Sequence, residues 1–449
     1  MAFPSLSLRD CRDGISRFWE HLRDGDVGSM GESPRATLYG LLLVVVVAAW
    51  LATRAGQQLA LVGRWVSSRR RPSASEVGKP ALRAGEGSKG LARQNGNGGW
   101  EPVEFKRPTA APAPNWDVHT SRPRPYRPFR YGKYHITMGL RNMKWDQWIE
   151  LDSHYLKFHA NKARRIRDRG SKCCYTAPDA NVQLGAHELL EELCGYLTER
   201  YPSLYKATAV GLDNLLTGES FNVVERPLVE DPMQMCARLV QDDLAIMFPK
   251  EDGQYYLLAG AILLAGFWRL EDKLGMPLSE IHTSADVPGY REKLEKGMMN
   301  FMRRVQPNSP VERNNYFIQV DDDLAWSPSI GDEDGKEGEV GWFSAEKNKA
   351  IEHHYFRSER QTLRRLPRSG GVVFTIRTYF HPITEICEEP YVPGRLASAV
   401  RSWGDDVSKY KGRDRYGDVL LEYLDRKHAE QLAAGLDPDK EEEVRSYPF

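Results

Sequence analysis

Residues 357–365 hold the densest group of side chains in this chain that could do chemistry. Their sequence is Arg-Ser-Glu-Arg-Gln-Thr-Leu-Arg-Arg, and the apolar, β-branched stretch 372–380 follows closely. Charge that enters a protein interior is costly unless it is paired or used. A guanidinium can donate to a polar ligand, and a carboxylate can hold a cationic amine or transfer protons. The alternative is an exposed face on which arginine and glutamate pair at helical spacing.

Three histidines are candidates for holding a metal. His282 lies between an aromatic, charged stretch and a Pro-Gly turn, His381 follows directly on the strand-like stretch 372–380, and His354 follows another histidine. A single histidine is more often a structural residue than a ligand. Position alone therefore leaves all three candidates open.

Several common classes of function lack their usual signals. The formal net charge is zero, so no global field attracts nucleic acid. The sequence contains no dinucleotide-binding glycine motif, no P-loop, no zinc-protease motif and no serine nucleophile elbow. Its six cysteines form neither a C-x-x-C pair nor a c-type heme attachment site. If the chain does redox chemistry, its electrons must come from another protein.

Apolar periodicity predicts helices early in the folded region and strands later. Leucines at helical spacing predict a helix over 188–201, and Asp231-Pro232 has the form of an N-cap that opens another helix. A further helix is expected over 291–305. β-branched and aromatic residues predict strands over 316–320 and 372–380. This order favours an α+β fold over a repeating βαβ sheet.

The first third of the chain differs in composition from the rest. Residues 36–53 carry no charge and are long enough to cross a bilayer as a helix, and more arginines follow this stretch than precede it. We expect a single-pass anchor over 36–60 in the endoplasmic reticulum membrane, with the main domain in the cytosol. The expected parts are a polar segment 1–35, the anchor 36–60, a disordered Pro/Gly-rich linker 61–127, a folded domain 128–430 and an acidic tail 431–449.

Short motifs along roughly residues 128–412 resemble one family. They are Met138-Gly139-Leu140, Trp148 to Asp152, Arg200-Tyr201-Pro202, Val240 to Leu244, Gly266 to Gly275, Ile281-His282, and Glu359 to Pro367. In this order they resemble the α subunit of heme-dependent oxidative N-demethylase, here in a membrane-anchored, fungal-type form. The resemblance implies a PAS-like antiparallel sheet flanked by helices.

The resemblance also implies roles for the charged residues. It makes His282 the ligand of the heme iron. His381 ranks second on its position alone, because it lies at the end of an expected strand, where its side chain could face a heme. We expect three neighbours to act on the oxygen side, Arg357, Glu359 and Arg360, and three further arginines to anchor the heme propionates, Arg364, Arg365 and Arg377. Arg357 and Arg360 are expected to lower the pKa of Glu359 and so keep it ionised.

Together these expectations describe a membrane-anchored, heme-dependent oxidoreductase. It would act on a small amine or a specialised metabolite, as a monooxygenase or oxidative demethylase, with electrons from a separate reductase. One alternative is a PAS-type heme sensor or carrier that binds a gas without turnover, because one fold can host both uses. Another is an interaction protein that has lost the cofactor.

Overall fold

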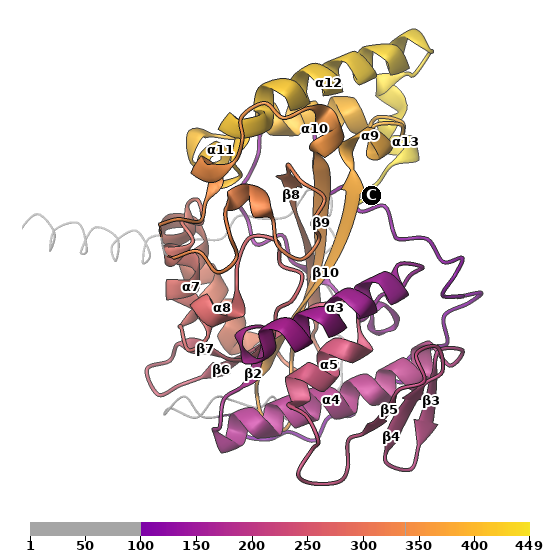
Figure 1. Cartoon of the computed structure of the whole chain (residues 1–449), viewed down its shortest axis with the longest axis vertical. Helices are drawn as coiled ribbons and strands as arrows, with labels where there is room; N and C mark the ends of the chain where they lie inside the picture. Colours follow the sequence, from indigo (N-terminus) through magenta and orange to yellow (C-terminus); the bar gives the residue numbers. More distant parts are fainter. Residues whose placement is uncertain (1–99, 337) are drawn as a thin grey trace, which may run out of the picture. The chain divides into compact units, whose positions relative to one another are not determined.

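The computed structural model describes residues 100–336 and 338–449, which lie in one compact unit spanning 88–449 (Figure 1). The core is a seven-stranded sheet in the order β1-β8-β9-β10-β6-β7-β2, with all neighbours antiparallel. Its strands are β1 Arg141–Asn142, β2 Cys174–Thr176, β6 Asp243–Pro249, β7 Tyr255–Ala261, β8 Val311–Gln319, β9 Tyr355–Arg365 and β10 Val372–Pro382. A second, three-stranded sheet contains β3 Tyr205–Thr208, β4 Gly211–Asn214 and β5 Ser220–Asn222.

Strand β9 is the charged stretch of the sequence. It pairs along nearly its whole length with β8 on one side and β10 on the other. Successive side chains of a strand point to opposite faces of the sheet. We call the side that receives the even-numbered residues of β9 face 1, and the side that receives the odd-numbered residues face 2.

Three helices cover one end of face 1, as Figure 1 shows near the bottom of the view. Leu244, Ile246 and Val373 point from the sheet into a core shared with these helices. Asp179 caps the second helix, and Asp231 caps the third, as its Asp-Pro pair predicts. The helices are α3 Tyr155–Arg169, α4 Ala180–Arg200 and α5 Pro232–Leu239.

The C-terminal helices cover the other end of face 1. Their apolar residues pack with Ile318 of β8 and Phe356 of β9 in a second core. These helices are α9 Ile383–Ile386, α10 Val392–Arg401, α11 Asp405–Tyr410, α12 Arg413–Ala433 and α13 Glu441–Val444.

Short helices lie against face 2, where Ala245, Val372 and Ile376 form a third core with Leu270, Leu278 and Met302. These helices are α6 Leu270–Lys273, α7 Leu278–Ser284 and α8 Glu295–Arg304, with a π-helical turn η3 Tyr290–Leu294 before α8. Short 3-10 turns complete the fold: η1 Trp145–Gln147, η2 Gly170–Lys172, η4 Pro328–Ile330, η5 Trp342–Ser344, η6 Ile351–His353 and η7 Pro438–Lys440.

Residues 100–127 are not a disordered linker. The indole N–H of Trp100 donates to the Pro367 carbonyl at 2.9 Å, and that of Trp116 donates to the Leu151 carbonyl at 2.8 Å. The expected acidic tail also packs, because Phe449 stacks on Tyr126 with ring centroids 5.0 Å apart. Aromatic residues hold both segments to the domain, although their composition is too poor in aliphatic residues to predict a core.

The expected fold class requires a correction. The antiparallel sheet with helices on both faces is observed, but across residues 100–336 and 338–449 no helix is long and apolar enough to span a membrane. The longest helices, α4 and α12, carry charged residues along their length. The described fold is therefore a sheet-rich domain with helices. The anchor expected at 36–60 and the linker residues 61–99 lie outside the described residues.

Candidate functional site

The residues predicted to form one site lie on both faces of the sheet. Arg357, Glu359 and Arg365 have odd numbers in β9 and point to face 2, whereas Arg360 and Arg364 point to face 1. Arg377 of β10 stands directly opposite Arg360 and shares its face. Side chains two positions apart in a strand share a face, but neighbours do not, so the continuous motif divides into two groups.

The arginines of face 1 are bound to protein groups. Arg360 pairs with Glu312 at 2.7 Å and donates to the Trp148 carbonyl at 3.2 Å. Arg377 pairs with Asp152 at 2.5 Å, and its guanidinium lies 4.5 Å from the centroid of the Phe158 ring.

Arg364 completes this face. It pairs with Glu192 at 2.6 Å and lies over the rings of Trp145 and Trp148, at 5.0 and 4.5 Å from their centroids. Each of these three buried arginines thus has a carboxylate partner, and two of the three also stack on aromatic rings.

Glu359 is the central carboxyl group of face 2. It is 7% exposed, and its Oε2 accepts a hydrogen bond from the Gln361 amide at 2.8 Å. Burial raises the pKa of Glu359 above its usual value, although Arg357 and Gln361 oppose the shift. The prediction that its neighbours lower this pKa is therefore wrong. Arg360 points to the other face, and desolvation outweighs the charge of Arg357.

Arg357 lies beside Glu359 but is held by the protein. Its guanidinium donates to the Gln319 side chain at 3.1 Å, the Leu264 carbonyl at 2.8 Å and the Leu324 carbonyl at 2.6 Å. Gly266 has φ +76°, and a Cβ there would lie 2.7 Å from the Arg357 guanidinium carbon. Arg357 therefore contributes a fixed positive charge, with its donors directed at protein oxygens.

Arg365 is also a structural residue of face 2. It donates to the carbonyls of Val305 and Gly370, both at 2.8 Å, and to the Tyr255 hydroxyl at 2.9 Å. All three nitrogens of its guanidinium are used. Four of its five N–H donors are directed at protein oxygens, so Arg365 is fixed by the fold.

His282 lies on α7 with its ring fixed in place. Its Nδ1 is 2.7 Å from the Leu278 carbonyl oxygen, and its ring stacks on Tyr290 at 4.8 Å with an angle of 11°. A carbonyl can only accept, so Nδ1 carries the hydrogen, and in the neutral ring Nε2 carries a lone pair. Burial lowers the pKa of His282, which favours that neutral form.

These features fit an axial heme ligand. Histidines that hold a metal commonly donate their other ring nitrogen to a carbonyl, which fixes the tautomer. Arg313 of β8 could hold a propionate, because its Nε is buried without a hydrogen-bond partner in the described part of the chain. The described residues contain no cluster of three or more metal-ligating side chains. A heme needs none, since the porphyrin supplies the other iron ligands.

Residues 139–421 match the family described as haem-dependent oxidative N-demethylase, alpha subunit-like. This is more than half of the chain. The chain belongs to this family. The matched region contains His282 and Glu359, and it begins after the expected anchor at 36–60, so it supports neither a membrane anchor nor a fungal-type form. The family name implies heme dependence and an oxidative activity on a small molecule.

The other two histidine candidates lie elsewhere in this family domain. His381 is on face 1, where its Nδ1 is 3.7 Å from Glu385 and burial lowers its pKa to about 4. His354 packs at the other end of face 1 against Tyr416, and its Nε2 is buried without a partner among the described residues. Neither shares a face with Glu359.

Sequence reasoning missed Lys411 as a site residue. Lys411 is 2% exposed and donates from Nζ to the Tyr316 carbonyl, and Nζ lies 4.1 Å from the centroid of the Phe317 ring. No ion pair joins it to a carboxylate within residues 100–336 and 338–449. Burial lowers its pKa to about 7, while Glu359 raises it. In the sequence Lys411 stands between Tyr410 and Gly412, and nothing in this short string predicts that its side chain is buried.

Arg313 was the other omission. Its Nη1 donates to the Gln361 side chain at 3.0 Å, so a short chain of hydrogen bonds links Arg313 through Gln361 to Glu359. The predicted strand began at residue 316, whereas β8 begins at Val311. A strand extended backwards from 316 would have placed Arg313 two residues from Asn315, which is opposite Glu359.

Proposed function

We propose that this chain is a heme-dependent oxidoreductase that removes a methyl group from a small amine, with electrons from a separate reductase. Family membership supports the class of reaction, and the neutral, fixed imidazole of His282 is the observation that carries it. Such a demethylation consumes dioxygen, two electrons and two protons, and yields the shortened amine, formaldehyde and water. Heme, when bound, would supply the activation of dioxygen.

In this proposal His282 would hold the iron through Nε2. The Leu278 carbonyl and the Tyr290 ring keep the imidazole in one orientation and one tautomer. Arg313 replaces the three arginines expected from the sequence as the propionate candidate. Arg365 and Arg377 serve the fold, because protein groups occupy them. Arg364 pairs with Glu192, although its nitrogens make no hydrogen bond among the described residues, and it points to face 1, away from Glu359.

Glu359 is proposed to hold and move a proton. A buried carboxyl with a raised pKa can stay protonated nearer neutral pH than an exposed one. It can pass its proton to the nitrogen of an incoming neutral amine, which leaves a carboxylate and an ammonium as an ion pair. Arg357 positions this charge, whereas Arg360, predicted to be catalytic, supports the sheet from the other face.

The test replaces His282 with alanine in the full-length protein. We expect the variant to bind at least tenfold less heme, or to show a changed heme absorbance, because the axial ligand is lost. The matched control is His381→Ala, which removes a half-buried imidazole from face 1. Unchanged heme content and absorbance in His282→Ala would refute the ligand assignment.

A second measurement tests turnover. Wild type with heme and a surrogate reductase should consume oxygen when a secondary or tertiary amine is added, and Glu359→Gln should bind heme but lose this consumption. Heme binding without amine-dependent oxygen consumption in wild type would instead support a sensor or carrier.

A further inference from the structure

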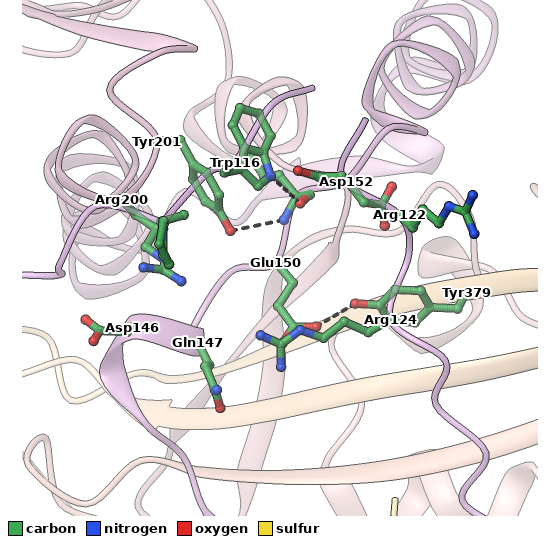
Figure 2. A pocket seen from close by; sticks show the side chains of 14 residues that line it. Trp116, Arg122, Arg124, Asp146, Gln147, Glu150, Asp152, Arg200, Tyr201 and Tyr379 are labelled. Carbon is green, nitrogen blue, oxygen red and sulfur yellow. Dashed lines mark hydrogen bonds and ion pairs between the residues drawn. The ribbon is translucent and has the colours of Figure 1, made fainter. Parts of the chain in front are cut away.

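Face 1 carries a second polar site that the proposed reaction does not use. A cavity of about 290 Å³ lies between the segment 113–124, the stretch 146–152 and Tyr379 of β10 (Figure 2). Tyr379 shares its face with Arg360, so the cavity is across the sheet from Glu359. Its volume is at the lower end of those that hold small molecules.

The buried carboxylates of this cavity are fully engaged. Glu150 accepts a hydrogen bond from the Tyr379 hydroxyl at 2.6 Å (Figure 2) and another from the Tyr126 hydroxyl at 3.0 Å. Asp152 accepts from Gln241 at 3.1 Å and pairs with Arg377 at 2.5 Å. Because the oxygens of these carboxylates already accept hydrogen bonds from protein groups, they are poorly placed to bind a cationic ligand.

Three arginines at the rim of the cavity have N–H groups that make no hydrogen bond to the described residues. Arg122 has no side-chain partner in the part of the chain that the structure describes. Arg124 contacts Glu150 at 3.3 Å and is 42% exposed. Arg200 donates from Nη1 to the Ala111 carbonyl at 2.7 Å, but its Nε is buried without a partner among the described residues. Figure 2 shows Arg200 at the left of the view, with Arg122 and Arg124, which belong to one segment, to its right.

Two aromatic residues form a fixed wall. The Trp116 indole donates to the Leu151 carbonyl at 2.8 Å, and the Tyr201 hydroxyl donates to the Ile149 carbonyl at 2.8 Å. Their rings lie 4.8 Å apart. The indole N–H and the hydroxyl are already hydrogen-bonded, so Trp116 and Tyr201 can contact a ligand only through their rings. The arginines would supply the positive charge.

We propose that this cavity binds a small metabolite that carries a carboxylate or a phosphate group. Guanidinium groups bind both kinds of oxyanion through paired hydrogen bonds. Arg124 pairs with Glu150 and Arg377 with Asp152, so Arg122 and Arg200 remain without a carboxylate partner among the described residues, against one further lining carboxylate, Asp146. This excess of one positive charge favours an anion. The site is independent of His282 and of heme, since every residue named here belongs to face 1 or its cover.

Calorimetric titration of the full-length protein with inorganic phosphate, and separately with malonate, tests the proposal. Arg122→Gln should weaken binding about tenfold, because a charge-assisted hydrogen bond is lost. Arg122 has no partner among the described residues, so this change should leave the fold intact. The control is Arg167→Gln, whose side chain is 71% exposed on α3 and pairs with its neighbour Asp168. The control should bind like wild type.

The two titrants also assign the ligand. A response to phosphate alone indicates a phosphate ester, and a response to malonate alone indicates a carboxylate. The proposal is overturned if wild type binds neither titrant at millimolar concentration. It is equally overturned if Arg122→Gln binds as tightly as Arg167→Gln, because the anion would then sit elsewhere. Either result leaves the heme test of His282 unaffected.

Discussion

Buried charged residues on the two faces of the central sheet differ in whether they have a partner of opposite charge. On face 1, Arg360, Arg364 and Arg377 each have a carboxylate within 2.7 Å. Glu359 of face 2 and Lys411, which senses its charge, are also buried but form no ion pair with each other in the described residues. Paired charges stabilise one arrangement, whereas unpaired ones shift their pKa toward neutrality. The three paired arginines of face 1 are therefore scaffold, whereas Glu359 and Lys411 have the properties of groups in a reactive site.

The largest expected effect is on face 1. Arg377→Met should lower the free energy of unfolding by about 3 to 5 kcal/mol, because it leaves the Asp152 carboxylate buried without its partner. Urea unfolding measures this loss. The double variant Arg377→Met/Asp152→Asn should recover part of it, since neither charge is then unpaired. A loss below about 1 kcal/mol would mean that face 1 does not depend on pairing.

Face 1 should also respond to acid through His381. Burial lowers its pKa from 6.5 to about 4, with Arg127 and His154 opposing its charged form. The unfolded chain then binds more protons between pH 4 and 6.5, so stability falls as the pH drops through that window by about 1.4 kcal/mol per unit. His381→Gln should flatten this part of the stability curve. Identical curves for variant and wild type would contradict the buried, neutral imidazole.

Lys411 should give face 2 a response at alkaline pH. Its pKa is lowered to about 7, so the folded chain binds fewer protons than the unfolded one between pH 7 and 10.5, and stability rises with pH there. Lys411→Met removes this pH-dependent contribution to the free energy of unfolding. The stability difference between wild type and variant should change by about 2 kcal/mol from pH 7.5 to 9. A constant difference would place Lys411 among the ordinary structural lysines.

The smallest effect is expected from Glu359→Gln. The amide resembles the protonated acid, so unfolding at pH 5 should change by less than about 1 kcal/mol. Because burial raises the pKa of Glu359, wild type loses stability as the pH rises above 4.5, and the variant should gain relative to it. A large loss in the variant at pH 5 would show that Glu359 is a structural charge like those of face 1.

Sequence reasoning identified the charged stretch 357–365 but not its division between the two faces of the sheet. The strand β10 and the helix α5 could be read from β-branched residues and from the N-cap at Asp231, because these are local signals. The expected order of helices first and strands later is wrong, since β1 to β7 precede residue 262 and α9 to α13 follow β10. The register of β9 depends on pairing with two distant strands, so the motif gave no sign that Arg360 and Glu359 point apart. Burial of Lys411 depends on contacts with β8, which are remote in sequence.

The packed ends of the chain have a practical consequence for how it can be cut. Trp100 and Phe449 lie outside the residues that match the family, yet both contact residues that support the sheet. Trp100 also lies over the Arg365 guanidinium, 4.6 Å from its carbon to the ring centroid. The region that matches the family, residues 139–421, is thus shorter than the region whose residues pack into the domain. A fragment that contains only residues 139–421 would lose the contacts of Trp100 and Phe449 with the domain. If such a fragment were unstable, that result would not bear on the roles of His282 and Glu359.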